Sequence, residues 1–217
     1  MPVSETRCQD GEKAQPLDLR NTYWLLRHGL SLANEAGLIV SSLENGMLPQ
    51  HGLAVAGLQQ ATEAGQRLRQ EVGPAAAAHV LVYASPFSRT LQTARAAAAE
   101  LGGVAVTAEA ALRERHFGAY ELQSHDNYHK LWAADVLDPG ARPPGGGESV
   151  EDVAARVRGL FQRLEATHRG ATLLLVAHGD LLSILWAVAV GAPLRGHRRH
   201  AFGPGELREL VLMQGGL

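Results

Sequence analysis

The chain has 217 residues, of which 46% are hydrophobic and 19% charged, with a formal net charge of −2 at pH 7 and a pI near 6.5. This length and composition predict one globular domain with a sizeable core. The weakly acidic balance argues against nucleic acid or a membrane surface as the main partner.

Residues 1–20 are polar, lack the apolar core of a signal peptide and contain acidic side chains that are unlike a transit sequence. We interpret them as a flexible tail that precedes a domain spanning residues 21–217. No later apolar run reaches the roughly 18 residues that a membrane span requires. Cys8 is the only cysteine, which excludes an intrachain disulfide and is compatible with a reducing compartment. We therefore expect a cytoplasmic protein.

A buried strand is predicted at residues 23–26, where an apolar run changes abruptly to Arg27, His28 and Gly29. Ligands bind at the carboxyl ends of the strands in open α/β sheets. This strand would therefore bring a cation and an imidazole to the ligand-binding edge. We expect Gly29 to let the backbone approach a ligand closely.

The next predicted elements are a mixed loop at 39–50, a helix at 53–72, a second strand at 80–84, a helix at 88–101 and a short strand at 104–107. Arg89 falls in the first turn of the second helix. The positive end of a helix dipole disfavours a cation there by roughly 0.3 to 1 kcal/mol unless an anion is bound as well. The position of Arg89 therefore indicates an anion site.

The stretch at about 119–147 is the least regular part of the chain, and it follows a loop that carries Glu114. We predict that it forms a short cap over the site, with a solvated surface excursion as the alternative. A helix then opens with a capping box made by Ser149 and Asp152. A strand at 172–177 ends in His178, and a helix at 181–190 and a strand within 206–213 follow.

Strands and helices alternate along the chain without a repeat or a linker. This order predicts an α/β fold, a three-layer α/β/α sandwich with a mostly parallel central sheet and a short cap insertion. The strand ends and the Glu114 loop together supply two Arg, two His and one Glu. That set suits a phosphoryl group, because a guanidinium binds two phosphate oxygens at once.

Four motifs in this order resemble the histidine phosphatase superfamily, in its phosphoglycerate-mutase-like branch. They are the RHG of 27–29 with Asn34 beyond it, the SPFSRTLQTA of 85–94, the LRERHFG of 112–118 and the VAHGD of 176–180. The resemblance implies a phosphomonoester hydrolase that acts through a phosphohistidine on small phosphorylated metabolites, without a metal or a cofactor. The alternatives are a cofactor-dependent phosphoglycerate mutase and a catalytically idle, phospholigand-binding or regulatory homologue. A monomer and a homodimer are both compatible with the sequence.

The resemblance also implies the site residues. The catalytic set is His28, Glu114, His178, Arg27 and Arg89, and the substrate-binding set is Arg27, Asn34, Arg89, His178 and Gly179. His28 is the expected nucleophile, provided that its other ring nitrogen keeps a proton by donating to a carbonyl, which the Gly29 turn could supply. His178 is expected to donate to the phosphoryl oxygens.

Glu114 is the expected general acid, and it must be protonated near neutral pH for that role. Arg113 and Arg115 flank Glu114 and would favour its ionised form if they pointed inward, so we expect both to point outward.

Two features bear on the substrate and on rival functions. The cap looks shorter than in the mutases, which favours hydrolysis, and residues such as His116 and the Arg198-Arg199 pair hint at polar or acidic substrates. His125 and His129, one helical turn apart, could chelate zinc in a metallohydrolase, but no third ligand follows at a recognisable spacing.

Overall fold

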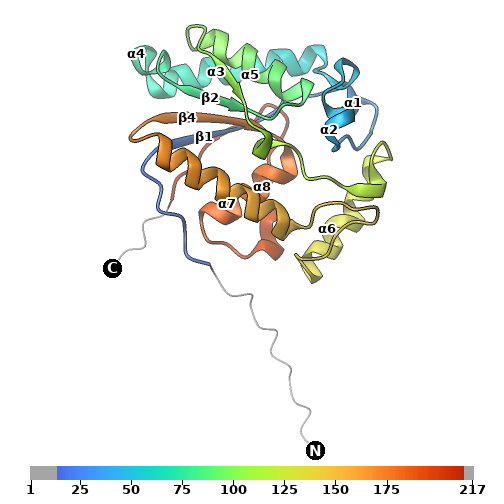
Figure 1. Cartoon of the computed structure of the whole chain (residues 1–217). Coiled ribbons are helices and arrows are strands. Elements are labelled where there is room, and N and C mark those ends of the chain that lie inside the picture. The colour runs from blue at the N-terminus through green and yellow to red at the C-terminus, as the bar shows by residue number, and fades with distance from the viewer. Residues whose placement is uncertain (1–13, 213–217) are drawn as a thin grey trace, which may run out of the picture.

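The computed structural model describes residues 14–212 (Figure 1). Its centre is a five-stranded sheet of order β3-β2-β4-β1-β5. The strands are β1 (Thr22–Arg27), β2 (Leu81–Ala84), β3 (Val106–Ala108), β4 (Thr172–Ala177) and β5 (Leu207–Glu209). The first four in the sheet order are mutually parallel, and β5 pairs antiparallel with β1. The predicted mostly parallel sheet is confirmed, and β5 lies within the range 206–213 predicted for the last strand.

Helices cover both faces of the sheet, as the three-layer prediction requires (Figure 1). The central strands β1 and β4 read as continuous apolar runs because both of their faces are buried. Tyr23 and Leu25 point to one face, whereas Trp24 and Leu26 point to the other.

One face packs against α7 (Val150–Thr167) and α8 (Gly179–Ala189). The predicted capping box opens α7: the Ser149 hydroxyl accepts from the Asp152 amide at 3.0 Å, and the Asp152 carboxylate accepts from the Ser149 amide at 2.9 Å. The other face packs against α3 (Val55–Val72), the short α4 (Pro74–Ala77) and α5 (Ser88–Glu100). Gly65 lets α3 and α5 approach closely, because a Cβ there would lie 2.7 Å from Ala97 Cα.

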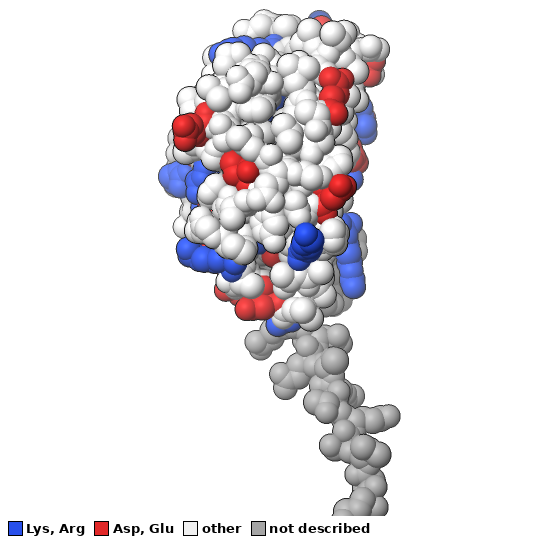
Figure 2. Space-filling model, turned by 90° about the vertical axis from the view of Figure 1, so that its right-hand side faces the viewer, with Lys and Arg blue, Asp and Glu red and all other residues white. Residues whose placement is uncertain are grey.

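The remaining elements are short. They are α1 (Leu32–Glu35), α2 (Leu43–Gly46), α6 (Tyr128–Leu137) and the 3₁₀ helices η1 (Pro49–His51), η2 (Ala110–Leu112), η3 (Gly118–Tyr120), η4 (His125–Asn127) and η5 (Leu194–His200). Figure 1 shows α1, α2 and α6 on the same side of the molecule. On that face, acidic and basic side chains are interspersed among uncharged residues (Figure 2).

The first described residues, 14–20, lie along the domain. The Leu17 amide donates to the Ala189 carbonyl at 2.9 Å, and Leu17 and Leu19 pack against the core beneath α7 and α8. The rest of the expected tail, residues 1–13, lies outside the described residues. Within residues 14–212, no helix combines the length and the apolar composition that a bilayer crossing requires.

Candidate active site

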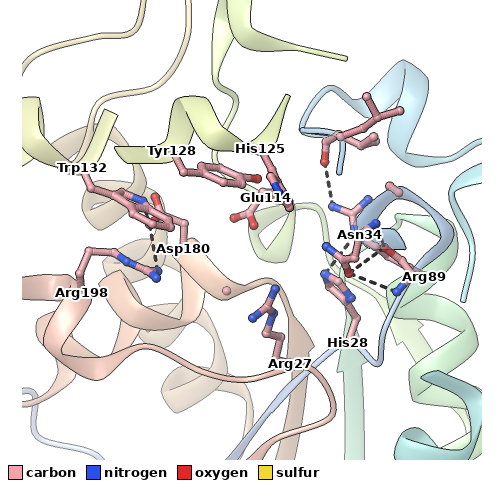
Figure 3. A pocket seen from close by; sticks show the side chains of 15 residues that line it. Arg27, His28, Asn34, Arg89, Glu114, His125, Tyr128, Trp132, Asp180 and Arg198 are labelled. Carbon is pink, nitrogen blue, oxygen red and sulfur yellow. Dashed lines mark hydrogen bonds and ion pairs between the residues drawn. The ribbon is translucent and has the colours of Figure 1, made fainter. Parts of the chain in front are cut away.

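A cavity of about 220 Å³ lies at the carboxyl edge of the sheet (Figure 3). It is lined by Arg27, His28, Ser31, Ala33, Asn34, Leu38, Val40, Arg89, Glu114, His125, Tyr128, Trp132, Gly179, Asp180 and Arg198. Residues predicted from four separate motifs therefore meet in one place. Of the predicted site residues, only His178 is not part of this lining.

His28 follows β1 directly, and its buried ring lines the cavity. Its Nδ1 lies 2.8 Å from the Gly29 carbonyl oxygen, so we assign the ring proton to Nδ1, as the sequence predicts. Nε2 then accepts from Arg89 Nε at 3.1 Å. Burial, together with the charges of Arg89 and Arg27, holds the pKa of His28 well below its usual range. His28 is therefore neutral, with an unprotonated Nε2.

Arg27 and Arg89 each carry a buried N–H group that has no hydrogen-bond partner within residues 14–212. These groups are Nε of Arg27 and Nη1 of Arg89. A buried donor without a partner costs about 1–3 kcal/mol, so the two positions are suited to an anion. Burial lowers the pKa of Arg89 to about 10, which leaves the guanidinium charged near neutral pH.

His178 lies between β4 and α8 and contacts Arg89. Its Nδ1 accepts from Arg89 Nη2 at 3.1 Å, and its Nε2 lies 2.8 Å from the Ser85 hydroxyl and donates to it. Burial, and then the charge of Arg89, lowers the pKa of His178 well below its usual range. Both ring nitrogens are engaged by protein groups, so the expected donation to a phosphoryl oxygen requires Arg89 to release Nδ1 and the ring proton to move from Nε2 to Nδ1. In this arrangement His178 supports Arg89.

Glu114 lies in the loop after η2 and is 6% exposed. One carboxylate oxygen accepts from the amides of Arg115 at 2.9 Å and of Leu181, in the first turn of α8, at 3.2 Å. Burial, and then the nearby charge of Asp180, raises the pKa of Glu114 despite these two hydrogen bonds. The environment therefore shifts Glu114 toward its protonated form.

The expectation that Arg115 points outward is wrong. Its side chain is 1% exposed, and Nη1 and Nη2 donate to the two oxygens of Asp135 at 2.6 and 2.8 Å. Nη1 also lies 3.3 Å from Asp180, so the charge of Arg115 is compensated by carboxylates from α6 and α8. Arg113 is 30% exposed and pairs with Glu148 at 2.6 Å.

Asn34 takes part in the capping box of α1. Its Oδ1 accepts from the amide and the hydroxyl of Ser31 at 3.1 and 2.9 Å, which leaves its NH₂ end at the cavity wall. Gly179 packs against Arg27, whose Cζ lies 3.2 Å from the place of a Cβ.

The role expected for Gly29 needs a correction. A Cβ on Gly29 would lie 2.1 Å from the Gly57 carbonyl oxygen, so the residue makes room for the backbone of α3, not for a ligand.

The segment 119–147 forms one wall of the cavity through His125, Tyr128 and Trp132. The rings of Tyr128 and Trp132 stack with centroids 5.0 Å apart. Glu121 fastens the segment to the loop after α1. Its carboxylate accepts from the amides and hydroxyls of Ser41 and Ser42 and from the Asn45 side chain.

Ser85 and Asp180 were not assigned to the site from the sequence. Ser85 follows β2 and holds His178, whereas Asp180 follows His178-Gly179 and lines the cavity. The available signal was their position directly beside predicted strand ends.

His125 lines the cavity, but His129 is exposed and its Nδ1 contacts the Asp126 carbonyl oxygen. Across residues 14–212, no group of three or more His, Cys, Asp or Glu is placed to hold a metal ion.

Residues 23–217 match the family model of the histidine phosphatase superfamily, branch 1. A probable phosphoglycerate mutase from Photorhabdus laumondii is 32% identical over 181 residues, which cover 81% of this chain and 78% of that protein. A metal-independent phosphoserine phosphatase from Arabidopsis thaliana is 29% identical over 167 residues, 75% of this chain and 66% of that protein. Mycobacterial glucosyl-3-phosphoglycerate phosphatase in complex with VO3 has a similar structure, with a TM-score of 0.70 and 27% identity over 87% of this chain and 92% of that one.

Proposed function

The chain belongs to the histidine phosphatase superfamily, branch 1, and from this premise we propose that it hydrolyses small phosphomonoesters through a phosphohistidine at His28. The observation that carries the proposal is the unprotonated Nε2 of His28 beside two buried arginine N–H groups that have no partner in the described part of the chain. A neutral imidazole nitrogen is a nucleophile, and the two N–H groups are matched to phosphoryl oxygens.

In the first step, Arg27 Nε, Arg89 Nη1 and the Asn34 amide bind the phosphoryl oxygens, and Nε2 of His28 attacks phosphorus. Arg89 Nε gives up its hydrogen bond to Nε2 as the N–P bond forms. The P–O ester bond breaks, and Glu114 passes its proton to the leaving oxygen. The Gly29 carbonyl continues to accept from Nδ1 and stabilises the phosphorylated ring.

In the second step, ionised Glu114 takes a proton from a water molecule, and the water oxygen attacks phosphorus. The N–P bond breaks, inorganic phosphate forms, and the electron pair returns to His28 Nε2. Charge on the phosphoryl group is stabilised throughout by Arg27 and Arg89, so the proposal needs neither a metal nor a cofactor. Its partner is a small phosphorylated molecule.

The proposal is tested by trapping the intermediate. Rapid quenching during turnover of a labelled phosphomonoester should yield a phosphoenzyme that is stable in base and labile in acid. The label should be absent from His28→Ala and present in a control with the exposed His79→Ala. Labelled His28→Ala would overturn the assignment of the nucleophile.

A phosphoglycerate mutase is the second candidate, because a relative at 32% identity is named as a probable one. A mutase returns the phosphoryl group to a bound product and must exclude water meanwhile, which calls for a closing lid. The wall segment 119–147 contains a single α-helix, α6, of 10 residues, which favours hydrolysis. Hydrolysis and mutase activity are distinguished by supplying 3-phosphoglycerate with a trace of 2,3-bisphosphoglycerate and measuring both products. Release of phosphate without 2-phosphoglycerate supports hydrolysis, and faster formation of 2-phosphoglycerate overturns it.

A further inference from the structure

The cavity carries another cation away from His28. Figure 3 shows Arg198, from η5, on the opposite side of the cavity from His28 and Arg89, with Arg27 between them. We call the part formed by Arg27, His28 and Arg89 the phosphoryl end, and the part formed by Tyr128, Trp132 and Arg198 the distal end. The proposed chemistry uses the first part and leaves the second without a role.

The guanidinium of Arg198 is held in place but is only partly engaged. Its Cζ lies 3.9 Å from the centroid of the Trp132 ring, which stacks in turn on Tyr128. Nη1 lies 3.5 Å from Asp180 and 3.4 Å from the Ser183 hydroxyl. No side chain or carbonyl within residues 14–212 hydrogen-bonds to its Nε or Nη2, and the side chain is 31% exposed.

The carboxylate of Asp180 does not neutralise the charge of Arg198, because it is shared with other donors. Asp180 accepts shorter hydrogen bonds from Trp132 Nε1 at 3.1 Å and His197 Nε2 at 3.2 Å, and it lies 3.3 Å from Arg115. The Arg198 contact is thus the longest of the four. Asp180 anchors one nitrogen of the guanidinium, and the other two have no hydrogen-bond partner among the described residues.

An anchored arginine is well suited to binding an oxyanion. A long side chain loses as much as about 2 kcal/mol of conformational entropy when it is ordered, and stacking on Trp132 has already ordered this one. The Tyr128 side chain also reaches into the cavity, between Arg198 and the phosphoryl end (Figure 3). Its hydroxyl is a donor that could bind the same group.

We propose that Arg198, supported by Trp132 and Asp180, binds a second oxyanion of the substrate, so that the preferred substrates are phosphomonoesters carrying a carboxylate or another phosphate. The inference rests on the proposed phosphatase function and names its substrate class. The phosphoryl dianion is matched by Arg27 and Arg89, and the second oxyanion is matched by Arg198.

The test compares isosteric substrates. Alkyl phosphates of increasing chain length end either in a carboxylate or in the matching carboxamide, and a third series ends in a second phosphate. At the best length, we expect wild type to prefer the acidic member by about tenfold in kcat/KM, mainly through KM, as one charge-assisted contact implies. The carboxylate and bisphosphate series show which oxyanion is preferred.

Arg198→Gln should lower kcat/KM for the acidic member about tenfold and abolish this preference, with a much smaller loss on the carboxamide and on p-nitrophenyl phosphate. Arg198→Lys, which keeps the charge and loses the planar fork, should retain part of the preference. The exposed neighbour Arg199→Gln is the matched control and should behave as wild type. Equal losses on both members of a pair would mean that Arg198 only clamps η5 to α6, and would overturn the inference.

Failure of the inference is distinguishable from failure of the proposed function. Calorimetric binding of the same pairs to His28→Ala measures the preference for the acidic member without turnover. A preference in binding that Arg198→Gln removes would support the inference even in a protein with no phosphatase activity. Equal binding of the two members would overturn it.

Discussion

At the phosphoryl end of the cavity, each side chain is placed by the backbone of a regular element. Arg27 ends β1, His28 follows it, and Arg89 lies in the first turn of α5. At the distal end, Trp132 and Arg198 come from α6 and η5, which are joined by side chains that stack on one another and converge on Asp180.

On the two proposals above, this difference separates the chemistry of the site from its selectivity. Moving the phosphoryl end would require displacement of a central strand, whereas the distal end depends on a few buried charged groups. We therefore expect substitutions at the first to abolish turnover on all substrates. Substitutions at the second should change stability and substrate preference.

The largest effect is expected for the phosphoryl end itself. His28→Ala should lower kcat by about 10⁴-fold or more on every phosphomonoester, because it removes the proposed nucleophile. The fold should persist, which thermal unfolding of the variant will check. If His28→Ala kept more than a few per cent of wild-type activity, turnover would not depend on the phosphoryl end as expected.

The distal end should respond in stability. Arg115→Met leaves the buried carboxylate of Asp135 without its ion-pair partner and removes one of the four contacts of Asp180, so it should lower the free energy of unfolding by about 3–5 kcal/mol in urea titrations. Arg113→Met breaks a partly exposed pair and leaves Glu148 paired with Arg156, so it should cost about 1 kcal/mol or less. Similar losses of unfolding free energy for both variants would contradict the view that buried ion pairs hold this part of the cavity wall in place.

Glu114 lies between the two ends and should affect only substrates with poor leaving groups. Glu114→Gln should slow alkyl phosphates by about 10²-fold or more, and p-nitrophenyl phosphate far less, because nitrophenolate leaves without a proton. The raised pKa of Glu114 means that wild-type activity on alkyl phosphates is present below that pKa and falls as the pH rises through it. The variant should lack this limb, and the exposed Glu151→Gln should keep it.

The smallest effect is expected for Glu121, which fastens the cavity-wall segment 119–147 to the loop after α1. Glu121 holds the loop after α1, in which the Val40 carbonyl accepts from Arg89 Nη2 at 2.8 Å. Glu121→Gln should raise KM about fivefold with little change in kcat, since it weakens hydrogen bonds that orient Arg89 indirectly. Glu44→Gln, exposed on α2, is the control. A loss of kcat without a rise in KM would contradict the view that Glu121 acts by orienting Arg89 for substrate binding.

The same comparison explains which parts of the fold and of the candidate site could be predicted from the sequence. The sheet and the phosphoryl end were predictable, because apolar runs that end in Arg27 and His28 or in His178 report both a strand and its ligand-binding edge. The placement of Arg115 was not, because its partner Asp135 lies 20 positions along the chain and Asp180 lies 65. Only tertiary packing brings those carboxylates together.

Two further details needed the structure for the same reason. A glycine after a strand indicates a close approach, but the sequence does not say whether a ligand or another backbone approaches Gly29. Likewise, a histidine at a strand end indicates the site, but the tautomer of His178 is set by Arg89, 89 positions away, which can only donate to Nδ1.

The contact between Gly29 and Gly57 ties the turn that carries His28 to the opening of α3. The amide of Gly29 also donates to Thr93 on α5 at 3.2 Å, and that of Leu30 donates to Gln60 on α3 at 2.8 Å. These amides therefore belong to the same cooperative unit as the two helices. Their hydrogen exchange should be as slow as that of the cores of α3 and α5, and the turn that carries His28 should open only when that whole layer opens.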